Sequence, residues 1–373
     1  MQTSAPATPG MALADVETPA LIVDLDLLER NLARMQQAAD SAGLRLRPHG
    51  KAHKTPEIAR RQIALGAVGI CVQKVSEAEV FAAAGIPDIL VTNQVVTPAK
   101  LDRLTALAGR CRIGICVDDA IQIDRLAAAI ARAALPADAV IDVYVEIDVG
   151  QGRCGLAVGP DVVALAQRIT AERAMHFAGL QAYHGAAQHL RQPEERRAAI
   201  ASAAGLAARA RDLLAGAGLP CPHITGGGTG SHAFEAASGV HDEIQPGSYA
   251  LMDADYARND TGETAAFEHA LRIRTSVIST AVPGQAVVDL GLKGASVDSG
   301  LPVSLAPGLA VTGLSDEHCT LRPGSGMTLR PGDAVDLIPG HVDPTCNLHD
   351  WIVACRGDRV EELWPISARG PGL

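Results

Sequence analysis

The feature that most restricts the fold of this chain is a regular alternation of strand-like and helix-like segments between residues 44 and 250. Short apolar runs typical of buried strands occur at 44–47, 69–73, 88–92, 112–117, 140–147, 177–183, 223–225 and 242–250. Ala-rich helical patterns fill the gaps at 56–65, 76–84, 98–108, 120–134, 160–170 and 194–215. Such an alternation predicts a (β/α)8 TIM barrel, with an open doubly wound sheet as the alternative.

The two ends of the chain have a different character. A strand-like run at 18–24 is followed by a helical pattern at 27–42, in which Leu28, Leu32 and Met35 recur at helical spacing. Beyond residue 258 the apolar runs alternate with polar residues or are β-branched, and Pro-Gly turns separate them. We therefore expect a barrel over 20–257 and a mostly antiparallel β domain over 258–373, joined by residues 1–19.

The composition excludes several classes of partner and compartment. With 32 basic and 42 acidic side chains the net charge is −10, which argues against nucleic acid as a partner. No apolar run reaches the roughly 20 residues that a membrane span requires. The eight cysteines form no CxxC pair, and the N-terminus lacks the pattern of a secretory signal. These features predict a cytoplasmic protein.

The first candidate for chemistry is the run RPHGKAHK at 47–54, at the end of the first predicted barrel strand. A surface role is the ordinary interpretation of a lysine. However, Lys51 and Lys54 share a short strand-to-helix turn with two histidines, at the face where barrel enzymes keep their active sites. A buried lysine there can have a depressed pKa and form a Schiff base with an aldehyde cofactor.

The second candidate is the glycine-rich run TGGGTGS at 225–231, which follows the seventh strand. Adjacent glycines before a helix offer backbone N–H groups to a phosphate, although a simple turn is the alternative interpretation. The position after strand seven is the usual phosphate site of a barrel. The run GSY after strand eight, residues 247–249, could add further donors.

The third candidate is the run HVDPTCNLHD at 341–350. If this segment is extended, His341 and Asp343 project on the same side and can bind one cation. A nitrogen and an oxygen ligand suit Mn²⁺, Mg²⁺ or Co²⁺, with water or substrate in the remaining positions. A polar loop without metal is the alternative, and Cys346 and His349 lie outside the two-residue register.

In combination these motifs resemble one enzyme family over residues 15–370. The runs that carry the resemblance are RPHGKAHKTPEIA, ICVQKVSEAEVF, EIDVGQGRCG, GLQAYHGAAQH, ITGGGTGS, QPGSYALMDADY, SDEH and HVDPTCNLHD. They are similar to the metal-activated D-threonine aldolases and 3-hydroxy-D-aspartate aldolases, which belong with D-serine dehydratase among the alanine-racemase-fold pyridoxal-phosphate enzymes. The resemblance implies a barrel that binds pyridoxal 5'-phosphate, a C-terminal β domain and a homodimer.

The resemblance also implies residue roles. Lys51 matches the Schiff-base lysine, Arg153 the arginine at the cofactor's phenolic oxygen, and His341 with Asp343 the metal pair. The residues expected to complete the cofactor site are Tyr183, Gly227, Gly228, Thr229, Gly230, Gln245, Gly247, Ser248 and Tyr249. Gln245 falls where a partner of the pyridine nitrogen is expected, and its amide can donate a hydrogen bond but carries no charge.

The expected reaction is the cleavage of a D-3-hydroxy amino acid to glycine and an aldehyde. D-Threonine is the first choice of substrate, and 3-hydroxy-D-aspartate, which gives glycine and glyoxylate, is the second. His189 is the expected general base, with His184 as the alternative, and Lys51 is expected to return the proton to Cα. D-Serine dehydratases carry His-x-Cys with zinc at the metal motif, so Asp343 favours the aldolases.

Two other classes of function stay open at this point. One is a lyase that eliminates water or ammonia from D-serine or 3-hydroxyaspartate. The other is a non-catalytic pyridoxal-phosphate carrier built on the same barrel. The C-terminal domain with its metal motif argues against a carrier, because such carriers lack it.

Overall fold

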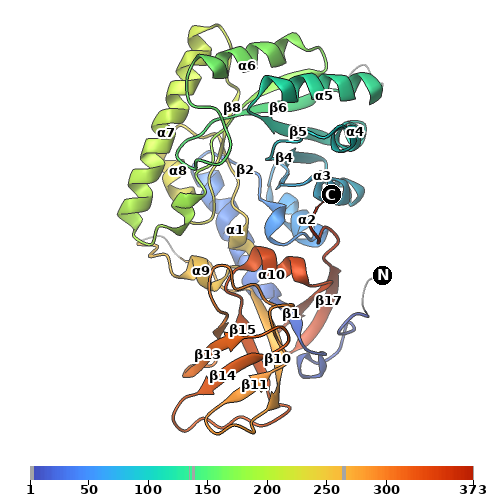
Figure 1. Cartoon of the computed structure of the whole chain (residues 1–373), viewed down its shortest axis with the longest axis vertical. Coiled ribbons are helices and arrows are strands. Elements are labelled where there is room, and N and C mark those ends of the chain that lie inside the picture. Colours follow the sequence, from blue (N-terminus) through green and yellow to red (C-terminus); the bar gives the residue numbers. More distant parts are fainter. Residues whose placement is uncertain (1–3, 134, 137–138, 263–265, 373) are drawn as a thin grey trace.

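The computed structural model describes residues 4–133, 135–136, 139–262 and 266–372. The chain forms an α/β barrel and a β domain, which lie one above the other in Figure 1. Within the described ranges, none of the helices is long and apolar enough to span a membrane.

The barrel predicted from the strand–helix alternation is confirmed. Its described parallel strands are β2 (Arg45–Leu46), β3 (Ile70–Val72), β4 (Asp88–Val91), β5 (Arg112–Val117), β6 (Ile141–Glu146), β7 (Met175–Gln181), β8 (His223–Gly226) and β9 (Glu243–Ile244). They pair in the order β2-β9-β8-β7-β6-β5-β4-β3. The barrel closes because the backbone N–H groups of Val68 and Cys71 donate to the carbonyls of Leu46 and Pro48.

Helices connect these strands, as the sequence predicts. They are α2 (Pro56–Leu65), α3 (Val75–Ala83), α4 (Pro98–Thr105), α5 (Ala120–Ala133), α6 (Pro160–Ala171), α7 (Pro193–Gly216) and α8 (His232–Ser238). Several begin with proline in the first turn, where its missing N–H costs nothing. Residue 134, the predicted end of the fifth helix, lies outside the described residues.

One predicted strand is much shorter than expected. The run 242–250 forms only β9, followed by a turn and the short 3₁₀ helix η4 (Ser248–Ala250). Pro246 has no backbone N–H for the sheet ladder, which explains why the strand ends before it. The backbone of Gly247 and Ser248 is therefore free to line the mouth of the barrel.

The second sheet confirms the mostly antiparallel β domain. Its strands include β10 (Leu271–Ser279), β11 (Ala286–Val288), β12 (Val303–Ser304), β13 (Leu309–Leu314), β14 (Cys319–Pro323), β15 (Ala334–Ile338), β16 (Trp351–Arg356) and β17 (Arg359–Pro365). Strand β1 (Ala20–Asp24) lies between β10 and β16 in this sheet. The chain therefore enters the barrel after Asp24, whereas the expected boundary followed residue 19.

Three of the described helices lie where the two domains meet. Helix α1 (Leu25–Ser41) buries Leu28, Leu32 and Met35, the side chains predicted from its periodicity, in a core shared with strands of the β domain. The short helices α9 (Ala254–Ala257) and α10 (Val342–Leu348) lie at the junction of the two domains (Figure 1). Residues from the end of the barrel and from the β domain therefore meet at one place.

Candidate active site

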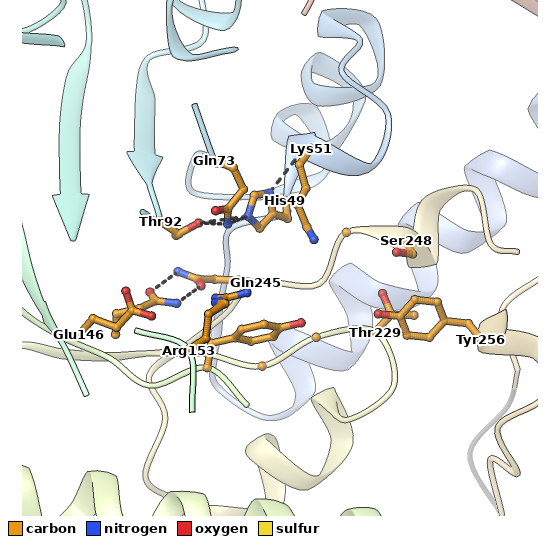
Figure 2. Close-up of a pocket in the computed structure, with 15 residues that line it drawn as sticks. His49, Lys51, Gln73, Thr92, Glu146, Arg153, Thr229, Gln245, Ser248 and Tyr256 are labelled. Carbon is orange, nitrogen blue, oxygen red and sulfur yellow. Dashed lines mark hydrogen bonds between the residues drawn. The ribbon is translucent and has the colours of Figure 1, made fainter. Parts of the chain in front are cut away.

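A cavity of about 230 Å³ opens at the carboxyl ends of the barrel strands (Figure 2). Its wall is formed by His49, Lys51, Gln73, Thr92, Glu146, Arg153, Gln181, Tyr183, Gly227, Gly228, Thr229, Gln245, Gly247, Ser248 and Tyr256. This set contains most of the residues expected to bind a cofactor. The carboxyl end of a parallel barrel is the usual place for such a site.

Lys51 lies on η2 (Gly50–Ala52), directly after β2, and points into the cavity (Figure 2). The strand end before it is anchored because the buried guanidinium of Arg47 forms ion pairs with Glu243 at 2.9 Å and Asp88 at 2.6 Å. Lys54 does not line the cavity, because its Nζ bonds to the Asn347 side chain and the Gly370 carbonyl. The geometry thus selects one of the two candidate lysines.

The charge state of Lys51 differs from the expectation of a depressed pKa. The Asp343 carboxylate lies 3.3 Å from Lys51 Nζ and raises the pKa of the lysine, and this effect outweighs burial. Lys51 therefore carries a proton in this arrangement. The lysine side chain keeps 42% of its surface exposed, so its amine can be reached from the cavity.

The glycine-rich run forms a tight loop between β8 and α8, and Gly227 has a φ of 76°. The loop packs so closely on Gln188 that a Cβ at Gly228 would lie 2.5 Å from its side-chain oxygen. Among the described residues, the backbone N–H groups of Gly227, Thr229 and Ser248 have no hydrogen-bond partner. Free N–H groups at the start of a helix are the donors that a phosphate requires, so these residues fit the phosphate of pyridoxal phosphate.

Two residues expected in the cofactor site lie outside the cavity wall. Gly230 donates its backbone N–H to Gln188 at 2.9 Å. The buried Tyr249 hydroxyl accepts a hydrogen bond from Gln62, and the Tyr249 backbone N–H donates to Thr229 Oγ1 at 3.0 Å. Both residues therefore support the loop from behind, and their predicted contact with the cofactor stays a prediction.

The middle of the cavity is suited to an aromatic ring. The Arg153 guanidinium lies 5.9 Å from the centre of the Tyr183 ring. Gln245 and Gln181 exchange hydrogen bonds of 3.2 and 2.9 Å between their amides, so the Gln245 side chain is fixed and uncharged. The expected pairing of this amide with a pyridine nitrogen stays a prediction.

Six residues of the wall were missed as individual candidates: His49, Gln73, Thr92, Glu146, Gln181 and Tyr256. His49 Nδ1 accepts the Lys51 backbone N–H, and its Nε2 lies 3.1 Å from Thr92 Oγ1. Burial and the charge of Lys51 hold the pKa of His49 well below its usual range, so this ring is neutral. The available signal was their position at or near the carboxyl ends of predicted strands, which Tyr256 lacks.

The predicted metal pair lies beside the cavity, but the segment is not extended as expected. His341 is the N-cap of α10 and Asp343 is in its first turn, where a carboxylate is favoured by the helix dipole. The segment turns into a helix because Pro344 is tolerated in a first turn and Thr345 Oγ1 donates to the His341 carbonyl. The same-side argument from strand geometry was therefore wrong.

The donor set nevertheless fits a divalent cation. His341 Nδ1 lies 2.7 Å from Asp298 Oδ2, and a carboxylate on one ring nitrogen is the usual support of a metal-binding histidine. Burial raises the pKa of Asp343, but the charges of Lys51 and His341 outweigh it, so the pKa is lowered and the carboxylate is ionised. In the described ranges no group of three or more His, Cys, Asp and Glu side chains is close enough to hold a metal. A cation here would take water or substrate as further ligands.

The two candidate bases are placed differently. His189 lies on η3 (Ala186–His189) after β7, with its ring 5.9 Å from the ring of Tyr256, a residue of the cavity wall. His184 packs on the loop at Gly150, where a Cβ would lie 2.9 Å from its Nε2. Neither histidine is part of the cavity wall, but His189 adjoins it through Tyr256. This arrangement favours His189 over His184.

Comparisons with known proteins agree with this geometry. Residues 23–255 match the family described as alanine racemase, N-terminal domain, and residues 270–355 match the putative serine dehydratase domain. A D-threonine aldolase from Arthrobacter sp. is 49% identical over 368 residues, which cover 98% of this chain and 96% of that protein. A 3-hydroxy-D-aspartate aldolase from Paracoccus denitrificans is 46% identical over 375 residues, with the same two coverages.

Solved structures give the same result. The crystal structure of D-threonine aldolase from Filomicrobium marinum has a TM-score of 0.95 and 48% identity, and the match covers 98% of this chain and 99% of that one. D-threo-3-hydroxyaspartate dehydratase from Delftia sp. HT23 has a TM-score of 0.84 and 31% identity, with 95% and 98% covered.

Proposed function

The chain belongs to the D-threonine and 3-hydroxy-D-aspartate aldolase group of alanine-racemase-fold enzymes, and we propose that it cleaves D-threonine to glycine and acetaldehyde. It is a lyase that uses pyridoxal 5'-phosphate and a divalent cation. One observation carries the proposal. Asp343, the predicted metal ligand, lies 3.3 Å from Lys51 Nζ, so the lysine proposed to hold the cofactor and a residue proposed to hold the metal can reach the same substrate.

When bound, pyridoxal phosphate supplies an electron sink for the bond that breaks at Cα, and the cation supplies a Lewis acid for the β-hydroxyl. Lys51 would hold the cofactor and later deliver a proton to Cα. Gly227, Thr229 and Ser248 would bind its phosphate through free N–H groups. His341 and Asp343 would hold the cation, and His189 would accept the proton of the β-hydroxyl.

The choice between aldol cleavage and elimination is tested by the products. We expect D-threonine to give glycine and acetaldehyde without ammonia, and 3-hydroxy-D-aspartate to give glycine and glyoxylate at a lower kcat/KM. Activity should disappear after treatment with a chelator and return with Mn²⁺. Formation of ammonia and a keto acid from either substrate would instead identify a dehydratase. A higher kcat/KM for 3-hydroxy-D-aspartate would reverse the order of substrates.

Replacement of His189 by asparagine tests the general base. The change keeps a polar group but removes the nitrogen that takes the proton, so we expect kcat to fall by roughly 10²–10⁴ with cofactor and substrate still bound. The acid limb of the pH–rate profile should disappear as well. Measuring kcat and Tm on one preparation separates this from a structural role, in which Tm falls and turnover per folded molecule is retained. The matched variant His184→Asn should keep most of its turnover.

Assembly and location complete the proposal. We propose a homodimer, as the family resemblance implies, and exposed apolar side chains on the β domain support an interface there: Leu292, Leu301, Val303 and Leu305. We also propose a cytoplasmic location, which is supported by eight cysteines that are all free thiols. Mass measurement in solution tests the dimer.

A further inference from the structure

We propose that Asp255 is a positioning residue that holds the ring of His189 in the tautomer and orientation needed for proton transfer. The inference rests on the proposed function, in which His189 is the general base. The contact that carries it is the separation of 2.6 Å between Asp255 Oδ2 and His189 Nδ1. The carboxylate accepts the Nδ1 proton of the neutral ring, so the lone pair lies on Nε2.

The two partners differ in exposure in the way that this role requires. The Asp255 side chain is 4% exposed, whereas the His189 side chain is 47% exposed. His189 Nε2 makes no hydrogen bond to any residue in the part of the chain that the structure describes. One ring nitrogen is therefore anchored to a buried carboxylate, and the other is open to a substrate or water.

Asp255 is held in the ionised form. Its Oδ1 accepts hydrogen bonds from Arg191 at 2.6 Å and from Arg258 at 2.5 Å. Burial raises the pKa of Asp255, but the two arginines and His189 outweigh it and lower the pKa. The carboxylate can therefore stabilise a protonated His189 ring but does not take the proton from it.

The backbone at Asp255 is also fixed relative to the segment that contains His341 and Asp343. The N–H groups of Ala254 and Asp255 donate to the carbonyls of Pro339 and Gly340, directly before His341. The carboxylate of Asp253 accepts the N–H of Val342 at 2.9 Å. Helix α9 thus connects the proposed base and the proposed metal pair through its backbone, which fixes the place from which the Asp255 side chain reaches the ring.

A purely structural role for Asp255 is the competing explanation. The Arg191 guanidinium donates hydrogen bonds to both Asp255 and Asn259, so Asp255 is also part of a network that stabilises this region. The two roles differ in how they depend on His189. A positioning residue acts only through the ring, so its loss adds nothing once the ring is gone. A structural residue acts on the whole site, so its loss adds to that of His189.

The experiment is a double-mutant cycle with Asp255→Asn, His189→Asn and the combined variant, with Asp260→Asn as an exposed carboxylate control. We expect Asp255→Asn to lower kcat about 10–10³-fold, which is less than the roughly 10²–10⁴-fold expected for loss of the base itself, with KM nearly unchanged. The combined variant should match His189→Asn, and Asp260→Asn should match the parent. A further loss of kcat in the combined variant, or a normal kcat for Asp255→Asn, would overturn the inference.

The pH–rate profile gives an independent readout. The charged groups that face His189 are Asp255 directly and Arg191 and Arg258 behind it, with the Tyr256 ring alongside. Removing the one carboxylate leaves the two cations, which disfavour a protonated ring. The acid limb should therefore move to lower pH in Asp255→Asn, and an unmoved limb would contradict the inference.

A measurement on the unmodified holoenzyme covers the case in which Asp255→Asn does not fold. The ¹⁵N NMR spectrum of histidine-labelled protein, assigned by comparison with His189→Asn, should show the proton of the neutral ring on Nδ1. A proton on Nε2 would overturn the inference. The proposed function fails separately, because it fails if the parent enzyme releases no glycine from D-threonine.

Discussion

Replacing Lys51 by alanine is expected to eliminate the visible absorbance band of lysine-bound pyridoxal phosphate and to reduce turnover below detection. Among the described residues Lys51 is the lysine of the cavity wall, and it lines the same cavity as the free N–H groups of Gly227 and Thr229. Its loss removes both the covalent anchor and the proton donor to Cα. Loss of the proton donor alone is expected to lower kcat by roughly 10²–10⁴-fold.

Lys54→Ala is the matched control for this experiment. Lys54 Nζ bonds to Asn347 and Gly370 and pairs with Glu77, so its loss should loosen the C-terminal tail and leave the absorbance band intact. Spectra and glycine release would be recorded for both variants after loading with cofactor. An unchanged band in Lys51→Ala together with a lost band in Lys54→Ala would reverse the assignment.

The fold could be predicted from the sequence because its signals are local. Leu28, Leu32 and Met35 recur at helical spacing, and all three are buried in the structure. The strand β10 alternates between buried and partly exposed side chains along most of its length, as its sequence pattern predicts. These patterns need only the periods of the helix and the strand. The predicted strand 242–250 was too long because its apolar pattern was extended past Pro246.

The candidate site could be predicted only in part. Lys51 and the glycine-rich loop could be proposed because each follows a predicted strand, at the face where barrel enzymes bind cofactors, whereas Arg153 was assigned only through the family resemblance. Tyr256 does not stand out, because it reaches the cavity only through the packing of α9 against the turn after β15. The raised pKa of Lys51 could not be predicted from the sequence either, because the carboxylate that raises it, Asp343, lies almost 300 positions further along the chain.

The metal pair carries the second large expected effect. We expect His341→Ala to bind pyridoxal phosphate normally and to lose aldol cleavage by about 10³-fold. That loss corresponds to roughly 4 kcal/mol, within the range that a Lewis acid supplies to a developing negative charge. Cofactor binding should survive because the residues that fit the cofactor and those that fit the metal are different side chains. Cofactor absorbance, Mn²⁺ content and glycine release on one preparation measure all three properties.

The structure makes the two metal variants unequal, and this difference sharpens the test. His341 contacts Asp298 and Ser299 but not Lys51, whereas Asp343 also pairs with Lys51 at 3.3 Å and lies 3.3 Å from Ser248 Oγ. Asp343→Ala should therefore lose cleavage and also lower the pKa of the lysine amine, because the carboxylate that raises it is gone. When Lys51 holds the cofactor, the same carboxylate would favour a proton on the Schiff-base nitrogen, so the absorbance band should respond to pH in Asp343→Ala and remain as in the parent in His341→Ala. His318→Ala, at an exposed histidine of the β domain, should match the parent in all assays.

Full activity of the chelated parent enzyme would rule out the metal role, and metal-dependent activity retained by both variants would place the cation elsewhere.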